Sequence, residues 1–220
     1  MIHYKPIIWV EGIIGSGKST FSKMLAEKLK LRLITEPVDD GYLTIFYENP
    51  KKWAFPMQID LLHKRYSLQK LAAYEASLAA VGESPYQGVV LDRGLPGDRV
   101  FAKLHMLEGN ITKVEWKTYL RAYETMTCSL IPPSLMIFLD VEPNTAMARV
   151  TNRDRSYERV GVPLEYLIKL QRGYYDLLSE IESGLHAWSR GMDLMRVPWN
   201  MDHQPMDEII EEVRNKYALD

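Results

Sequence analysis

Cysteine is almost absent from this chain: Cys128 is the only one in 220 residues, which excludes an intramolecular disulfide. We expect Cys128 to be a small buried apolar side chain. No apolar run approaches the length of a membrane span, and the first residues lead into a strand-like run without the pattern of a cleaved signal. These absences predict a reducing, cytoplasmic compartment and no membrane partner.

Charge of one sign is also scarce. The chain has 27 Lys and Arg against 29 Asp and Glu, a net charge of −2 at pH 7, and no basic tail or stripe. Electrostatic binding of nucleic acid needs a basic patch, so no nucleic-acid partner is predicted. A chain of this length can bury one hydrophobic core, and we predict that residues 1–220 form a single domain.

Short apolar runs of the kind found in buried strands recur along the chain, at 6–10, 32–35, 88–92, 134–140 and 194–198. Helical patterns separate them. This alternation predicts an α/β fold in which helices cover both faces of a parallel sheet. Ligands bind such sheets beyond the carboxyl ends of the strands. We therefore expect the chemistry in the segments that follow strand ends: 12–19, Glu36-Pro37, Asp92-Arg93 and Asp140.

The segment EGIIGSGKST (11–20) fits the phosphate-loop pattern G-x-x-x-x-G-K-[ST]. Glycines in such a loop let successive backbone N–H groups turn inward around a phosphate, while the lysine adds charge and the hydroxyl ligates Mg²⁺. A strand-like run precedes the segment, and apolar residues at helical spacing follow it, namely Phe21, Met24, Leu25 and Leu29. The pattern predicts a site for a nucleoside triphosphate and Mg²⁺ made by Gly12, Ile13, Ile14, Gly15, Ser16, Gly17, Lys18, Ser19 and Thr20.

Two long insertions interrupt the alternation. Residues 41–81 hold aromatic loops and then a helix that we expect to begin near Pro56, since proline is tolerated in a first helical turn. Residues 141–178 hold an arginine-dense helix end, then GVP and a second helix.

The arginines of the second insertion admit two interpretations. One is a solvated, salt-bridged helix face. Beside a triphosphate site, however, Arg149, Arg153 and Arg155 favour a lid over about 149–160 that grips phosphates. We prefer the lid.

Six motifs occur in a particular order: EGIIGSGKST, TEPV (35–38), YENPKKWAFPMQ (47–58), DRGLPGDR (92–99), RVTNRDRSYE (149–158) and GVPLEYLIKL (161–170). Together they resemble the deoxynucleoside kinases related to deoxycytidine, deoxyguanosine and insect multisubstrate kinases. The similarity runs from residue 6 to about residue 180. It implies a P-loop kinase fold with a five-stranded parallel sheet, phosphoryl transfer from ATP to a deoxyribose 5′-hydroxyl, and a homodimer formed through a helix pair.

The resemblance also assigns catalytic roles. A 5′-hydroxyl is a weak nucleophile, so a carboxylate must accept its proton. Glu36 matches the family's base, and Arg93 matches an arginine that steadies this base and the developing phosphate charge. With Lys18 they form the predicted catalytic set. Asp92 matches the acidic residue, usually glutamate in animal members, that reaches Mg²⁺ directly or through water, and with Ser19 it is the predicted metal site.

Base recognition has its own signature. Gln58 and Arg65 are seven residues apart on one predicted helix, so they project from the same face. An amide can pair with a nucleobase edge in two hydrogen bonds. Asp98 matches the aspartate that pairs with this arginine in the deoxycytidine and deoxyguanosine kinases. Tyr47 and Glu158 match the pair that holds the sugar 3′-hydroxyl, the alternatives being a core aromatic and an exposed helix acid.

The chain departs from the family pattern at the position of the stacking aromatic. This position falls on Ala102, with Phe101 one place earlier. Either the loop is shifted by one residue or the base pocket is wider, and a wider pocket favours purines. We expect purine deoxynucleosides or deoxycytidine to be preferred over thymidine.

Rival functions remain open. Thymidylate kinase shares the P-loop, an EP segment, a DR motif and a lid, but it phosphorylates a phosphate and needs cationic clamps more than a base. The EPV segment and the set Gln58, Arg65 and Asp98 favour the nucleoside kinase. A catalytically silent structural relative would be expected to lack Lys18, Glu36 or Arg93, and all three are present. We therefore predict a deoxynucleoside kinase of nucleotide salvage.

Overall fold

The structure, a computed structural model, describes residues 4–35, 40–152, 162–200 and 206–220. Its five strands are all parallel and follow the order β2-β3-β1-β4-β5. They are β1 (Ile7–Glu11), β2 (Arg32–Ile34), β3 (Val89–Asp92), β4 (Leu135–Asp140) and β5 (Asp193–Pro198). Each lies within one residue of its predicted run at both ends, and the predicted α/β class is confirmed.

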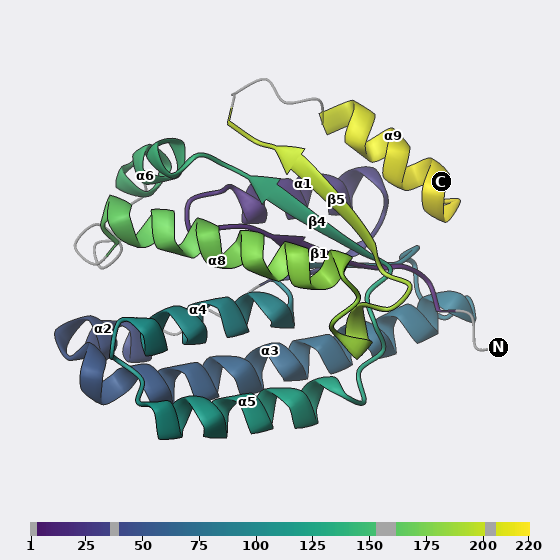
Figure 1. Cartoon of the computed structure of the whole chain (residues 1–220). Coiled ribbons are helices and arrows are strands. Elements are labelled where there is room, and N and C mark those ends of the chain that lie inside the picture. The colour runs from purple at the N-terminus through teal and green to yellow at the C-terminus, as the bar shows by residue number, and fades with distance from the viewer. Residues whose placement is uncertain (1–3, 36–39, 153–161, 201–205) are drawn as a thin grey trace.

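Helices flank the sheet on both faces. The described helices are α1 (Lys18–Lys28), α2 (Asp40–Glu48), α3 (Pro50–Ala80), α4 (Leu95–Leu107), α5 (Lys113–Thr127), α6 (Pro143–Thr151), α8 (Leu164–Glu182) and α9 (Met206–Tyr217). Figure 1 shows α1 and α9 on one side of the sheet and α8, α4, α3 and α5 on the other. All five residues of β1 are buried, as expected for a central strand covered twice.

Two parts of the hydrophobic core matter for the site. The main core surrounds the sheet, where the indole N–H of Trp9 donates to the side-chain oxygen of Gln69 at 2.7 Å and ties α3 to β1. A second cluster fills the space between α3, α4 and α5 and contains Leu62, Leu95, Ala102, Tyr119 and Tyr123. We call it the helical cluster. It sets the distance between the helices that carry the predicted base-recognition residues.

The first insertion is more helical than predicted. Its aromatic segment forms α2, and α3 begins at Pro50, six residues before the predicted start at Pro56. The side chain of Asn49 caps α3 by accepting a hydrogen bond from the Lys52 N–H at 3.2 Å, and Pro50 occupies the first helical position, which suits proline. This local start signal and the packing of Ala54 and Met57 against α2 keep the helix continuous through Pro56.

The side chain of Cys128, which was predicted to be buried, is exposed. Cys128 follows the last turn of α5, and its thiol donates to the Thr125 carbonyl at 3.1 Å. The buried face of α5 repeats every fourth residue, through Tyr119, Tyr123 and Thr127, and Cys128 falls outside it. Met24 is 37% exposed because it lies at the edge of the α1 face that packs on the sheet.

No helix in the described ranges is both long enough and apolar enough to cross a membrane.

Candidate active site

The phosphate loop lies at the carboxyl end of the central strand. Gly15 and Gly17 have φ values of +79° and +89°, in the left-handed region that favours glycine. A side chain at Gly15 would also meet the Ala146 carbonyl at 2.4 Å. Lys18 opens α1, and its ammonium donates to the carbonyls of Gly12 at 3.1 Å and of Ile13 at 3.0 Å. The lysine is thus held against the loop whose phosphate it is predicted to bind.

The other predicted loop residues differ in exposure. Ser19 and Thr20 are exposed in the first turn of α1, Ile14 is half-buried, and Ile13 is buried in the core. The hydroxyl of Ser16 is buried and has no hydrogen-bond partner within the described residues. The α1 N-terminus carries no side-chain cap, so its first N–H groups suit an anion.

Arg93 reaches the phosphate loop from the next strand. Strand pairing places Asp92 beside Val10, and Arg93 follows with φ of +77°, a left-handed conformation that is uncommon for a residue with a side chain. Such backbone strain persists where the surrounding structure enforces it, and it concentrates at functional sites. The buried guanidinium donates to the Gly12 carbonyl at 3.4 Å and lies 4.9 Å from the centre of the Phe101 ring.

Glu11 and Tyr174 hold Arg93 in place. Glu11 is fully buried, and its carboxylate accepts hydrogen bonds from the Gly94 N–H at 2.8 Å and the Tyr174 hydroxyl at 2.9 Å. Arg93 donates to the Tyr174 hydroxyl and lies 3.6 Å from the Glu11 carboxylate. Burial raises the pKa of Glu11, while Arg93, the Tyr174 hydroxyl and Lys18 oppose that rise.

Sequence reasoning did not single out this network. Tyr174 lies 163 residues from Glu11 along the chain, and no local pattern joins them. Glu11 stands in the quoted loop segment, one residue ahead of the glycine pattern. The sequence signal that could have identified Glu11 is an acidic residue directly after a strand-like apolar run.

The predicted base-recognition residues lie on facing helices. Gln58 and Arg65 are both buried on α3, and Asp98 is buried in the first turn of α4. The structure brings Arg65 and Asp98 together in an ion pair whose side chains are 6% and 0% exposed. The Gln58 side-chain oxygen is buried and makes no hydrogen bond in the described part of the chain. Buried polar groups of this kind need partners.

A tyrosine from α5 completes the contacts of Asp98. The Tyr119 hydroxyl donates to the second carboxylate oxygen of Asp98 at 2.6 Å, and its ring stacks on Trp116 with centroids 5.5 Å apart. Burial raises the pKa of Tyr119 well above its ordinary value, and the Asp98 charge adds to the rise. Tyr119 was missed because its contact with Asp98 joins two different helices, and no local sequence pattern shows such a contact.

Ala102 and Phe101, the two candidates for the position of the stacking aromatic, have different surroundings. Ala102 is fully buried within the helical cluster, whereas the Phe101 ring lies against the Arg93 guanidinium. Phe101 is therefore the aromatic next to the predicted catalytic arginine, which favours the shifted alternative over a wider pocket. Tyr47 is half-buried on α2, with its ring 5.1 Å from that of Phe46.

The arginine-dense segment is described in part. Arg149 lies in the last turn of α6 and donates to the carbonyls of Ser16 at 3.3 Å and of Trp199 at 3.0 Å, so it contacts the phosphate loop. The predicted residues Glu36, Arg153, Arg155 and Glu158 lie outside the described residues.

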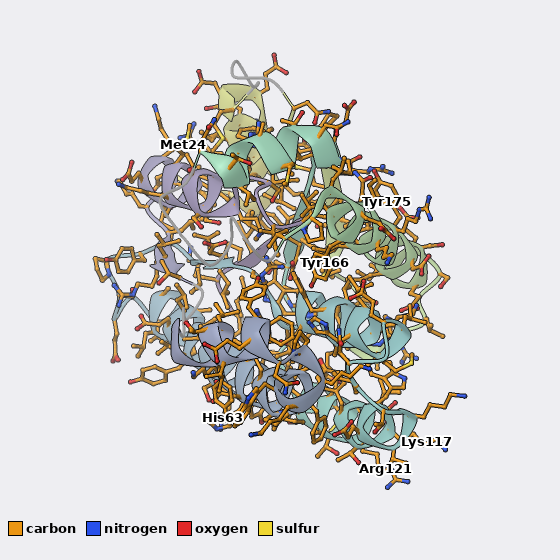
Figure 2. All side chains as sticks on the ribbon, turned by 90° about the vertical axis from the view of Figure 1, so that its left-hand side faces the viewer. Met24, His63, Lys117, Arg121, Tyr166 and Tyr175 are labelled. Atoms are coloured by element: carbon orange, nitrogen blue, oxygen red, sulfur yellow. The ribbon has the colours of Figure 1, made fainter. Side chains whose placement is uncertain are left out.

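Asp140, the fourth strand-end candidate, belongs to the β4–β5 edge rather than to the phosphate loop. Its carboxylate pairs with Arg196 at 2.7 Å and accepts from the Tyr175 hydroxyl at 2.8 Å. Tyr175 belongs to α8 (Figure 2). The Asp140 carboxylate therefore joins β4 to β5 and α8.

The residues predicted to bind Mg²⁺ fit a hard cation. No group of three or more His, Cys, Asp or Glu side chains in the described ranges could hold a metal. However, Mg²⁺ that travels with nucleotide phosphates needs only one or two protein ligands. Asp92 is buried, and its Oδ1 atom has no hydrogen-bond partner in the described residues. Together with the Ser19 hydroxyl it supplies the oxygen ligands that Mg²⁺ prefers.

Known proteins resemble this chain over nearly its whole length. A family model described as deoxynucleoside kinase matches residues 8–217. A deoxyadenosine kinase of Dictyostelium discoideum is 31% identical over 96% of this chain and 78% of its own length. A deoxyguanosine kinase of the same organism is 32% identical over 97% of this chain and 70% of its own length.

A solved structure agrees with these relatives. The deoxyadenosine kinase from M. mycoides with bound dATP superposes with a TM-score of 0.76 at 26% identity, covering 97% of this chain and 99% of that one. This likeness confirms the predicted P-loop kinase fold. The family match, the relatives and the fold show that this chain is an enzyme, and that it belongs to the deoxynucleoside kinase family.

Proposed function

We propose that this enzyme transfers the terminal phosphate of ATP to the 5′-hydroxyl of purine deoxynucleosides or deoxycytidine, in preference to thymidine, and that it serves nucleotide salvage. The observation that carries this proposal is the buried Arg65–Asp98 pair, together with the buried Gln58 side-chain oxygen on α3 that has no hydrogen-bond partner in the described residues. Relatives named deoxyadenosine, deoxyguanosine and deoxyadenosine/deoxycytidine kinases support it.

The polar pair explains the expected preference. Arg65 offers N–H donors and Asp98 offers an acceptor, which together complement the amino and carbonyl edges of guanine and cytosine, and the amino edge of adenine. Thymine has no amino group, and its methyl group would face two buried polar side chains. A site that buries polar groups discriminates strongly against ligands that leave them unpaired.

The proposed chemistry assigns each residue a task. Glu36 accepts the proton of the 5′-hydroxyl, and Arg93 stabilises the charge that develops on the phosphate. Lys18 and the arginines Arg149, Arg153 and Arg155 hold the triphosphate, while Tyr47 and Glu158 hold the sugar 3′-hydroxyl. Ser19 and Asp92 would hold Mg²⁺, which shields the negative charge of the phosphates when it is bound.

Self-association and location are further parts of the proposal. A groove of about 310 Å³ runs between α4 and α8, and Leu107 at its side is 67% exposed. We propose that a second copy of the chain covers this groove, because the resemblance implies a dimer formed through a helix pair. Light scattering during gel filtration tests it, and a monomer at all concentrations would contradict it.

We place the enzyme in the cytoplasm, on the basis of its scarce cysteine.

The deciding experiment is an acceptor panel with ATP as donor: deoxyadenosine, deoxyguanosine, deoxycytidine, thymidine and thymidine monophosphate. We expect one or more of the first three to have the highest kcat/KM. Thymidine as the best acceptor would contradict the base pocket and leave the kinase assignment intact. Thymidine monophosphate as the best acceptor would favour the thymidylate-kinase alternative. A Lys18→Ala variant controls for a contaminating kinase.

A further inference from the structure

Asp98 has two carboxylate oxygens, and two helices each contact one of them. Arg65 on α3 contacts Oδ1, and the Tyr119 hydroxyl on α5 donates to Oδ2 at 2.6 Å. The Asp98 side chain is completely buried, so water cannot replace either contact. The orientation of this carboxylate therefore depends on both partners.

Tyr119 is itself held rigidly. Its ring stacks between Trp116, with centroids 5.5 Å apart, and Tyr123, with centroids 6.2 Å apart. The opposite side of α5 faces outward, where Lys117 and Arg121 extend from the molecule (Figure 2). Because these contacts fix the ring, the Tyr119 hydroxyl has little freedom, and it donates its proton to the Asp98 carboxylate.

We propose that Tyr119 is a positioning residue for base selection, whose hydroxyl holds the Asp98 carboxylate in the orientation that accepts a hydrogen bond from an amino-bearing base. The inference rests on the proposed function, because Asp98 must face the base for its orientation to matter. Tyr119 acts through Asp98 and does not itself touch the substrate.

The chemistry follows from the direction of the hydrogen bond. A carboxylate paired with arginine is an acceptor only, so the Tyr119 hydroxyl is the donor. Without this donor, Asp98 can rotate to meet the Arg65 guanidinium with both oxygens, the geometry that such pairs prefer. That rotation would take an acceptor away from the base. A base with an exocyclic amino group would lose more than thymine, which has no amino group to donate.

The chain offers a matched control for this inference. Tyr123 lies one turn further along α5, in the same stack and the same helical cluster, and it is equally buried. Its hydroxyl makes no hydrogen bond in the described residues. Tyr119→Phe and Tyr123→Phe thus delete the same atom from neighbouring rings, and only the first removes a bond to Asp98.

The experiment measures kcat and KM for the acceptor panel in wild type and both variants. Tyr119→Phe should raise the KM for the best amino-bearing deoxynucleoside roughly tenfold, which is the effect of losing one hydrogen bond to a charged group. The kcat and the KM for ATP should change less than about threefold, and selectivity over thymidine should fall. Tyr123→Phe should match wild type in all of these values.

A double-mutant comparison separates positioning from folding. In an Arg65→Met/Asp98→Ala background, which leaves no stranded charge, Tyr119→Phe should leave the relative affinities for deoxynucleosides unchanged, as measured by titration calorimetry. The proposal is overturned if Tyr119→Phe lowers only the melting temperature, or if its effect persists without Asp98. If wild type prefers thymidine, the selectivity part of the proposed function fails. The comparison of the two Tyr→Phe variants on the best acceptor still decides the role of Tyr119.

Discussion

Removing one partner of the Arg65–Asp98 pair should destabilise the protein far more than removing both. Both side chains are almost completely buried, so each variant with a single replacement leaves a charge in the interior without its counterion. We consider Arg65→Met, Asp98→Ala and the double replacement. Methionine fills much of the volume of the arginine side chain, and alanine removes the carboxylate.

The structure sets the expected magnitudes. Each single replacement should lower the free energy of unfolding by about 3–5 kcal/mol, the cost of stranding a buried charge. The double replacement leaves no stranded charge, but it leaves the Tyr119 hydroxyl without its acceptor, which costs about 1–3 kcal/mol. The two single effects should therefore exceed the double effect by roughly 3 kcal/mol or more.

Urea denaturation measures this difference in the free energy of unfolding. The measurement is made at low temperature because a loss of about 5 kcal/mol approaches the whole stability of a typical domain. Lys23→Met is a control, since Lys23 and Glu27 form an exposed pair on α1 and its removal should leave stability close to that of wild type. The double variant should also phosphorylate thymidine better than wild type, and Arg65→Met alone should do worse. Additive effects of the two replacements on stability would refute the reasoning.

Three further predictions test other parts of the site. Glu36→Gln should keep deoxynucleoside affinity and lose about 10²–10⁴-fold in turnover, because an amide cannot accept the proton; near-normal kcat would remove Glu36 from the mechanism. Arg153→Ala and Arg155→Ala should each reduce turnover more than deoxynucleoside affinity, and a change in thermal stability alone would favour the solvated helix face. Burial lowers the pKa of His105 to about 4. Between pH 6.5 and about pH 4 the unfolded chain therefore binds a proton at this histidine that the folded chain does not bind. Stability should therefore fall by up to about 3 kcal/mol as pH drops from 6.5 to 4, and His105→Gln, compared by urea denaturation across this range, should remove that share of the slope.

Local patterns predicted the framework of the site well. Each strand is a buried run whose composition and length are visible without any knowledge of its neighbours, so all five strands were placed to within a residue. The seven-residue spacing of Gln58 and Arg65 sufficed to put both on one inner face of α3. The predicted start of α3 at Pro56 was wrong because Asn49 followed by Pro50 is the stronger start signal, and Pro56 lies inside the helix.

Contacts between distant segments could not be predicted in the same way. The pairing of Arg65 with Asp98 was anticipated only through the family resemblance, since periodicity shows which face of a helix is buried and not what it meets. Tyr119 and Tyr174 lie on buried helix faces that pack against the core in the ordinary way. Their hydroxyls acquire a role only when α5 and α8 are docked in place.

The order of the strands separates the residues proposed to bind the base from those proposed to bind the triphosphate. The residues proposed to select the nucleoside stand on α3, which packs on β3, and on α4, which follows β3 in the chain. Arg149 and Trp199 come from the segments that follow β4 and β5, on the other side of β1 in the strand order. Arg93 contacts both, since its guanidinium donates to the Gly12 carbonyl of the phosphate loop and lies against the Phe101 ring of α4. On the proposed function, replacing residues of α3 and α4 should therefore change which acceptor is used and leave the triphosphate-binding residues in place. A fold arranged like this can evolve new acceptor preferences, or be engineered for nucleoside analogues, by exchanging a few side chains on two helices.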